Sequence, residues 1–443
     1  MIIYKKDTWL AIFISFFLIL YFFIYLIRTD SVFNNIFLLE ACISFQFISY
    51  FFISIFKEGV NVFFSKTYNN FILMFFMFHV GISITNVLGY KNDYFDSQLY
   101  WYYTEQTYFS IFSVVVFLNS YLLMGIFSFN DNKNIFLKDR KYFFIINKYF
   151  LLFSSLFWIY SVYFILGIKE YKDFYDNQDN MFVLIFVYFT ALINISFLIS
   201  ILDSEKSKFT LLVFLLWGGF AFNLGVRGPV FYPLALALAL LISQKNFKLN
   251  YKRLLIISFI FLSGLSYKFL DRNNMESGGG LDPLAAVREM GGSLRPIYEV
   301  HLWISNDLTP YLGTTYLAPF DRILNKFFNY KEQIPSILDD RLMNVAIMER
   351  AGPYGFSIVA EAFVNFTNYG VFFLGIIAGL FFKKIDSKIL NVSITPLFLI
   401  FAYGFFYHIR QSFVSVFGVV SIGVLYLIVL IFFSKSLNYL KQN

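Results

Sequence analysis

Two arginines, Arg227 and Arg410, lie in tight turns between apolar segments of the sequence. Arg227 is flanked by glycines in GVRGP at 225–229, Arg410 follows YHI at 407–409, and no acidic residue is close in sequence to either. An arginine beside hydrocarbon is costly and usually functional, and its planar fork binds phosphate or carboxylate through two hydrogen bonds. We expect both to bind an anionic ligand. The alternative is that they extend to lipid headgroups.

A polar stripe marks another apolar segment. Ser357, Glu361 and Asn365 are four residues apart, so they share one face of a helix. A carboxylate placed there can accept the proton of an attacking hydroxyl, with Ser357 and Asn365 holding the substrate. The alternative is a buried ion pair between Glu361 and an arginine. Glu40, in a different apolar segment, has no such polar companions and is interpreted as mainly structural.

The composition sets the class of protein. Of 443 residues, 58% are hydrophobic and 14% are charged, against about 25% charged in soluble domains. A soluble enzyme and a disordered chain are both excluded. Three histidines and one cysteine exclude a Cys/His metal cluster and an intramolecular disulfide. The sequence contains no nucleotide-binding or metalloprotease motif, so we expect no cofactor, no metal and no nucleic-acid partner.

The chain is predicted to be an all-α polytopic membrane protein. A bilayer core of about 30 Å needs about 20 apolar residues in a helix, which gives about twelve candidate spans. They are 8–27, 33–56, 70–89, 107–129, 142–168, 181–202, 209–224, 229–243, 254–270, 356–382, 392–409 and 413–433. The spacing of Gly375 and Gly379 predicts close helix packing.

The charges predict an orientation. With the N-terminus inside, nineteen Lys and Arg of the short segments fall on the inner side and six on the outer side, as expected for cytoplasmic termini. Three regions follow: a bundle of about nine helices at 1–270, an extracytoplasmic loop at 271–355, and a bundle of about three helices at 356–443.

The long loop is predicted to contain helices. Apolar residues recur with helical spacing at 316–328, which indicates an amphipathic helix on the membrane surface, and 283–305 is predicted to be helical with a break near Gly291. Nine of the eleven arginines lie on the outer side, including Arg288 and Arg295. They are expected to bind an anion or to pair with the eleven acidic residues of the loop.

Four segments resemble the bacterial O-antigen and capsular polysaccharide polymerases, the Wzy family. They are GVRG at 225–228, REMGGSLRP at 288–296, YLGTTYL at 311–317 and GFSIVAEAFVNF at 355–366, the last of which is the most specific. The motifs cover roughly 220–415, and the remainder is similar only in its plan of about a dozen spans with one long outer loop.

The resemblance implies an enzyme of the bacterial inner membrane, similar in fold to GT-C glycosyltransferases and O-antigen ligases. It would transfer a growing glycan from undecaprenyl diphosphate to a sugar hydroxyl of an incoming lipid-linked repeat unit on the extracytoplasmic face. Its partners would be the lipid-linked oligosaccharide, the lipid bilayer and, as an option, a chain-length regulator. Arg227, Arg288, Arg295 and Arg410 would surround the diphosphate, and Glu361 would act on the acceptor together with Arg227 and Arg288.

Two alternatives stay open. A ligase that transfers the glycan to another acceptor would use the same arginines. A lipid-linked oligosaccharide flippase or exporter, which is no enzyme, would place charges in the middle of several spans, whereas here the polar residues concentrate at the outer ends and in one loop.

Overall fold

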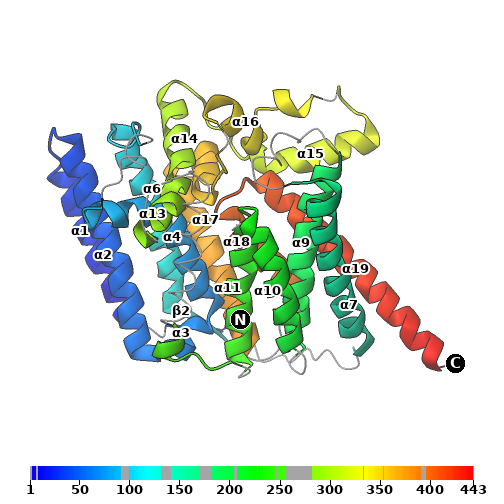
Figure 1. Cartoon of the computed structure of the whole chain (residues 1–443). Coiled ribbons are helices and arrows are strands. Elements are labelled where there is room, and N and C mark those ends of the chain that lie inside the picture. Colours follow the sequence, from blue (N-terminus) through cyan, green and yellow to red (C-terminus); the bar gives the residue numbers. More distant parts are fainter. Residues whose placement is uncertain are drawn as a thin grey trace.

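The protein is a bundle of long helices with a smaller group of helices at one end (Figure 1). The computed structural model describes residues 2–5, 8–90, 99–130, 141–168, 181–203, 207–226, 228–244, 247–254, 282–332, 334–352, 354–390 and 396–442. Arg227 and nearly all of the predicted span 254–270 lie outside the described residues.

Seven helices of the described residues are long and apolar enough to cross a membrane. They are α1 (Thr8–Leu26), α2 (Val32–Glu58), α4 (Thr67–Val87), α6 (Glu105–Leu123) continued by the 3-10 turn η1 (Met124–Ile126), α7 (Lys141–Tyr160) continued by the π-helical turn η2 (Ser161–Ile165), α17 (Ile358–Leu390) and α19 (Phe413–Gln442). The chain is therefore a multi-pass membrane protein.

Four more predicted spans are helical. α9 (Met181–Ile201) has 21 residues, of which Tyr188–Ile201 is the continuous apolar stretch with described side chains. The other three, α10 (Ser207–Asn223), α11 (Gly228–Ser243) and α18 (Pro396–His408), have 13 to 17 residues. Helices of 10–17 residues are too short to cross a bilayer without tilt or local thinning. The predicted total of twelve spans is thus not confirmed.

Aromatic side chains fill the space between the helices. The ring of Phe71 in α4 lies 5.3 Å from Tyr121 of α6, 4.6 Å from Phe382 of α17 and 5.4 Å from Phe406 of α18. Helices α6 and α17 pack closely at the predicted glycines, because a Cβ at Gly375 would lie 2.0 Å from Ser120 Oγ, and one at Gly379 would lie 2.8 Å from Met124 Cβ. The predicted packing role of this glycine pair is confirmed.

Helix α17 is broken at Phe366 and Thr367. Thr367 has a positive φ of 55°, rare for a β-branched residue, and Phe366 also leaves the helical region. The carbonyls of Val364 and Asn365 just before the break accept the backbone N–H groups of Tyr311 and Leu312, at 3.0 and 3.1 Å. The short helix that carries Glu361 is therefore joined to the segment before α15, separately from the long helix that follows.

The smaller group of helices covers one end of the bundle. It comprises α13 (Pro283–Met290), η4 (Gly291–Leu294), α14 (Arg295–Ser305), α15 (Thr314–Phe328), η5 (Ser336–Leu338) and α16 (Met343–Arg350). The predicted break near Gly291 and the predicted helix at 316–328 are both confirmed. Figure 1 shows α15 lying across the bundle end, and Leu317, Phe320, Phe327 and Phe328 on it are exposed.

The opposite end is held by two other contacts. Strands β1 (Ile2–Lys5) and β2 (Phe127–Asn130) pair antiparallel at this end, where the short helix α3 (Val60–Phe64) also lies. Near the end of α17, the buried Asp386 accepts hydrogen bonds from the backbone N–H and hydroxyl of Thr67, both at 2.6 Å, and from the N–H of Tyr68 at 3.2 Å. It thereby satisfies N–H groups at the start of α4 that have no acceptor within their own helix.

Candidate active site

Glu361 is fully buried at the start of α17 and accepts three hydrogen bonds. Its Oε1 accepts from the Thr315 hydroxyl of α15 at 3.0 Å. Its Oε2 accepts from the backbone N–H of Phe413 at 2.5 Å and lies 3.2 Å from Nε2 of His408. The carboxylate therefore joins α17, α15 and the turn between α18 and α19.

The other two members of the predicted polar stripe are also satisfied by protein groups. Asn365 donates to the Thr315 hydroxyl at 2.6 Å and accepts from the N–H of Gly313 at 2.8 Å. Ser357 accepts from the N–H of Ala360 at 3.1 Å, as a helix cap does. Among the described residues, the partners of the Glu361 carboxylate are Thr315, His408 and Phe413, so none of them is an arginine.

Arg288 is buried against the end of α4. Its guanidinium donates to Thr85 Oγ1 at 3.1 Å and to Asn86 Oδ1 at 2.7 Å. Asn86 in turn donates to Glu40 at 2.9 Å, and the Tyr102 hydroxyl donates to the same carboxylate oxygen. A Cβ at Gly81 would lie 2.2 Å from the Val287 carbonyl, so α4 and α13 touch through their backbones here.

Arg295 lies in an aromatic cage and pairs with Glu299 one turn further along α14. Its Cζ is 4.9 Å from the ring centres of Trp101 and Tyr298, 5.5 Å from Tyr100 and 5.8 Å from Tyr354. Guanidinium–aromatic contacts of this kind are stabilising when desolvated. Arg295 therefore packs α14 against the segment before α6.

Arg410 is partly buried in the turn between α18 and α19. Its Cζ lies 5.8 Å from the ring centre of Phe78 in α4. Within the described part of the chain its guanidinium makes no hydrogen bond or ion pair. Arg288 contacts Thr85 and Asn86, which follow Phe78 on α4 by seven and eight residues. At 1.5 Å per residue, the two arginines therefore contact α4 at points roughly 11 Å apart along the helix axis.

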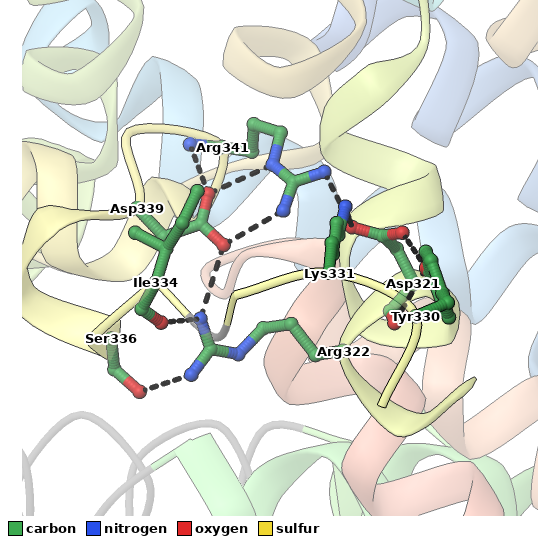
Figure 2. A network of polar contacts seen from close by, with 8 residues as sticks. All are labelled: Asp321, Arg322, Tyr330, Lys331, Ile334, Ser336, Asp339 and Arg341. Carbon is green, nitrogen blue, oxygen red and sulfur yellow. Dashed lines mark hydrogen bonds and ion pairs between the residues drawn. The ribbon is translucent and has the colours of Figure 1, made fainter. Parts of the chain in front are cut away.

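In the predicted loop 271–355, the other arginines that the structure describes pair with acidic residues. This is the alternative to anion binding that the sequence left open. Figure 2 shows the main group, which we call the α15 charge cluster: Asp321, Arg322, Lys331, Asp339 and Arg341. Asp339 is 3% exposed and accepts from Arg322 at 3.1 Å and from Arg341 at 2.8 Å, while Asp321 accepts from Lys331 at 2.6 Å and from Arg341 at 2.9 Å. Arg350 pairs with Asp340 at 3.3 Å.

The charges of this cluster shift each other's titration. Hydrogen bonds from Lys331 and Tyr330 hold the pKa of Asp321 well below its usual range. Burial alone would raise the pKa of Asp339, but hydrogen bonds from Arg341 and Arg322 lower it below its ordinary value. Hydrogen bonding to Asp339 raises the pKa of Arg341. Asp321, Asp339 and Arg341 are therefore charged at neutral pH, and each has a partner of opposite sign.

Some important side chains were not singled out from the sequence. Thr315 and His408 lie within segments of interest, but their contact with Glu361 joins residues 46 and 47 positions away. Tyr232 of α11 and His79 of α4 come near Arg410 because α4 and α11 pack together and Phe78 of α4 contacts both Tyr232 and Arg410. Sequence spacing carries no signal for such contacts, since it reports only neighbours along one helix.

Comparison with known proteins identifies the family of the chain. The family model for O-antigen polysaccharide polymerase Wzy matches residues 10–443. Protein CapE of Staphylococcus aureus is 25% identical over 315 residues, which is 68% of this chain and 70% of that protein. No solved structure matches the chain. The protein therefore belongs to the O-antigen polysaccharide polymerase Wzy family, whose members are glycosyltransferase-like enzymes that act on lipid-linked oligosaccharide units in a membrane.

Proposed function

We propose that the protein transfers a growing glycan from undecaprenyl diphosphate to a sugar hydroxyl of an incoming lipid-linked repeat unit. Family membership supports a repeat-unit polymerase in polysaccharide biosynthesis. The observation that carries the finer proposal is the guanidinium of Arg410, which has no polar partner among the described residues, at the bundle end covered by α13–α16. As the glycosidic bond breaks, the leaving diphosphate gains negative charge, and a fixed cation stabilises that charge most in the transition state.

The four predicted diphosphate-binding arginines divide into two kinds in this proposal. Arg410 and Arg227 contact the diphosphate: Arg410 has no described polar partner, and Arg227 immediately precedes α11. Arg288 and Arg295 already have protein partners, so they act by fixing α13 and α14 beside α4 and α6 and by adding positive charge nearby.

Glu361 is proposed to orient the acceptor side of the site. Its carboxylate, with Asn365, fixes the segment 311–315 and the turn that carries Arg410, while Ser357 caps the helix that carries Glu361. Its assignment as the proton acceptor stays a prediction. Three hydrogen bonds already occupy the two carboxylate oxygens, which favours the positioning role.

We propose further that the protein has a GT-C-like architecture, lies in the bacterial inner membrane and places α13–α16 on the extracytoplasmic face. The charge distribution of the short segments supports this orientation. In a Cys42→Ala background, cysteines replacing the exposed Lys326 and Lys384 test it, because Lys326 lies on α15 and Lys384 lies near the other end of α17. An impermeant thiol reagent added to whole cells should label Lys326→Cys alone; labelling of Lys384→Cys alone overturns the orientation.

The polysaccharide ladder of a deletion strain tests the reaction. A polymerase predicts that the strain retains glycan of a single repeat unit and loses all longer chains, and that the wild-type gene restores them while Arg410→Ala does not. A ligase or flippase predicts the loss of all attached glycan. Full-length polymer in the strain carrying Arg410→Ala at wild-type protein levels would remove this arginine from the site.

A further inference from the structure

Two buried polar atoms beside Arg410 have no hydrogen-bond partner in the described part of the chain. They are the hydroxyl of Tyr232 in α11 and Nε2 of His79 in α4, and each side chain is only 1% exposed. An unpaired buried polar group is destabilising and needs an explanation. Other buried groups also lack partners there, but these two lie near a cation, Arg410, that makes no polar contact with the residues the structure describes.

Ring contacts relate Tyr232 to Arg410. The ring centre of Phe78 is 5.8 Å from Arg410 Cζ and 5.6 Å from the ring centre of Tyr232. His79 follows Phe78 directly on α4 and stacks on Phe75 with 4.4 Å between ring centres, and the charge of Arg410 acts on both Tyr232 and His79. We call Arg410, Tyr232 and His79 the Arg410 cluster.

The Tyr232 hydroxyl also faces the start of α11. A Cβ at Gly228 would lie 3.3 Å from that hydroxyl and 3.0 Å from the ring edge. The first-turn N–H groups of a helix have no acceptor within their own helix and carry partial positive charge. A hydroxyl donor therefore lies at a helix N-terminus, and the Phe78 ring contacts both the Tyr232 ring and the Arg410 guanidinium. Guanidinium groups, hydroxyl donors and helix N-termini are the groups that bind phosphate.

His79 offers the complementary chemistry. Its Nδ1 lies 3.0 Å from the carbonyl oxygen of Phe75. A carbonyl can only accept, so Nδ1 carries a proton and, in the neutral ring, Nε2 keeps its lone pair. That lone pair accepts a hydrogen bond from a hydroxyl, and it has no such donor in the described protein.

From this geometry, and resting on the proposed function, we propose that the Arg410 cluster is the reaction centre. Tyr232, Arg410 and the first turn of α11 hold a phosphate group of the lipid diphosphate, and His79 accepts a proton. The acceptor hydroxyl oxygen forms a bond to the anomeric carbon, and the bond from that carbon to the diphosphate oxygen breaks with its electron pair on the diphosphate. The hydroxyl proton passes to His79 Nε2 and later leaves to solvent. Tyr232 and His79 are thus catalytic residues.

The position of the cluster favours a lipid-borne ligand over a soluble one. His79 is eight residues from the end of α4 at Val87, roughly 12 Å along the helix. A diphosphate attached to a polyprenyl chain enters such a place from between helices, whereas free pyrophosphate would have to leave bulk water.

Tyr232→Phe tests the phosphate contact, because it removes the hydroxyl and keeps the ring. Tyr121→Phe is the matched control, since that buried hydroxyl donates to the Tyr68 carbonyl at 2.8 Å. Purified proteins in nanodiscs are titrated with undecaprenyl diphosphate and, separately, with inorganic pyrophosphate. Tyr232→Phe should weaken lipid diphosphate binding about tenfold or more while Tm stays the same or rises; Tyr121→Phe should lower Tm and leave binding unchanged.

Three outcomes overturn the phosphate assignment. Unchanged binding by Tyr232→Phe is one. A fall in Tm equal to that of Tyr121→Phe is another, because the hydroxyl would then have a structural partner. Binding of inorganic pyrophosphate as tight as that of the lipid diphosphate is the third. None of these outcomes alters the polymer ladder of the deletion strain, so the proposed function is judged separately.

His79→Gln tests the proton acceptor, with His301→Gln as its control. His301 is also buried, but its Nε2 lies 3.0 Å from Ser113 Oγ. Because Gln cannot take the proton, His79→Gln should bind lipid diphosphate normally and polymerise about 10²–10⁴-fold more slowly. His301→Gln should lower Tm and keep its rate per folded protein. A rate for His79→Gln within threefold of wild type overturns the assignment.

Discussion

The α15 charge cluster and the Arg410 cluster both contain arginine, but they differ in whether their polar atoms have partners within the described protein. In the first, every charged member has a partner of opposite sign, and Asp339 is shared by two arginines (Figure 2). In the second, within the described residues, a guanidinium, a hydroxyl and an imidazole nitrogen lie together without polar contacts. Groups that are satisfied by the protein hold it together, and groups that are not are available to a substrate.

The largest expected effect is that of Arg410→Ala. If the unpaired guanidinium stabilises the leaving diphosphate, its loss should slow polymerisation about 10²–10³-fold, as removal of a transition-state donor does. Tm should change little, because no polar partner is left behind. Arg410→Lys keeps the charge without the fork and should restore only part of the rate. The assay is repeat-unit transfer by purified protein. A wild-type rate in Arg410→Ala would show that this guanidinium, like those of the α15 charge cluster, does not act on the substrate.

Glu361→Gln should mainly lower stability. Gln presents one oxygen and one amide in place of two oxygens that accept three hydrogen bonds, and a loss of this kind costs about 1–3 kcal/mol. We expect a lower Tm in detergent and a rate per folded protein within tenfold of wild type. An unchanged Tm with a 10²–10⁴-fold loss of rate would instead identify Glu361 as the general base.

Asp339→Asn should loosen the α15 charge cluster with a smaller effect. It removes a nearly buried carboxylate shared by Arg322 and Arg341, but both arginines are partly exposed and can be hydrated. The expected loss is about 1 kcal/mol, confined to the loop. Amide hydrogen exchange should become faster in 314–341 and stay unchanged in α6. Faster exchange throughout the bundle would show that the cluster supports the whole fold.

The smallest expected effect is a response to acid. The pKa values of Asp321 and Asp339 are lowered in the folded chain. Their contribution to stability is therefore complete above the ordinary aspartate pKa of about 3.9 and is lost as pH falls through the lowered values. A spin label at Lys326→Cys on α15 should keep its mobility from pH 7 to about 4 and become more mobile below. Mobility that changes between pH 7 and 5 would contradict this, and Asp339→Asn should reduce the response.

The helices were largely predictable because apolar runs and periodicity are local properties. The amphipathic helix at 316–328 and the break at Gly291 appear where the sequence places them. The break at Phe366 and Thr367 was not predicted, since neither residue is proline or glycine and the break is set by hydrogen bonds from the distant 311–312.

The partners of the site residues were less predictable. The loop offers eleven acidic residues to its arginines, and only packing selects Asp339 for Arg322 and Arg341. Glu361 was correctly placed on a polar helix face, but its partners come from α15 and the α18–α19 turn. Such contacts depend on how separate helices meet, which the spacing within one helix does not encode.

The contact between Asp386 and the start of α4 has a consequence for biosynthesis. The two ends of this contact are 319 residues apart in the chain. At about 5–20 residues per second, a ribosome needs roughly 15–60 s to make the intervening segment. Throughout that interval the first turn of α4 is already made but lacks its carboxylate acceptor, so water or the insertion machinery must supply one. Closure of this end of the bundle is therefore a late event, and a nascent chain halted before Asp386 should present the start of α4 to quality-control proteases.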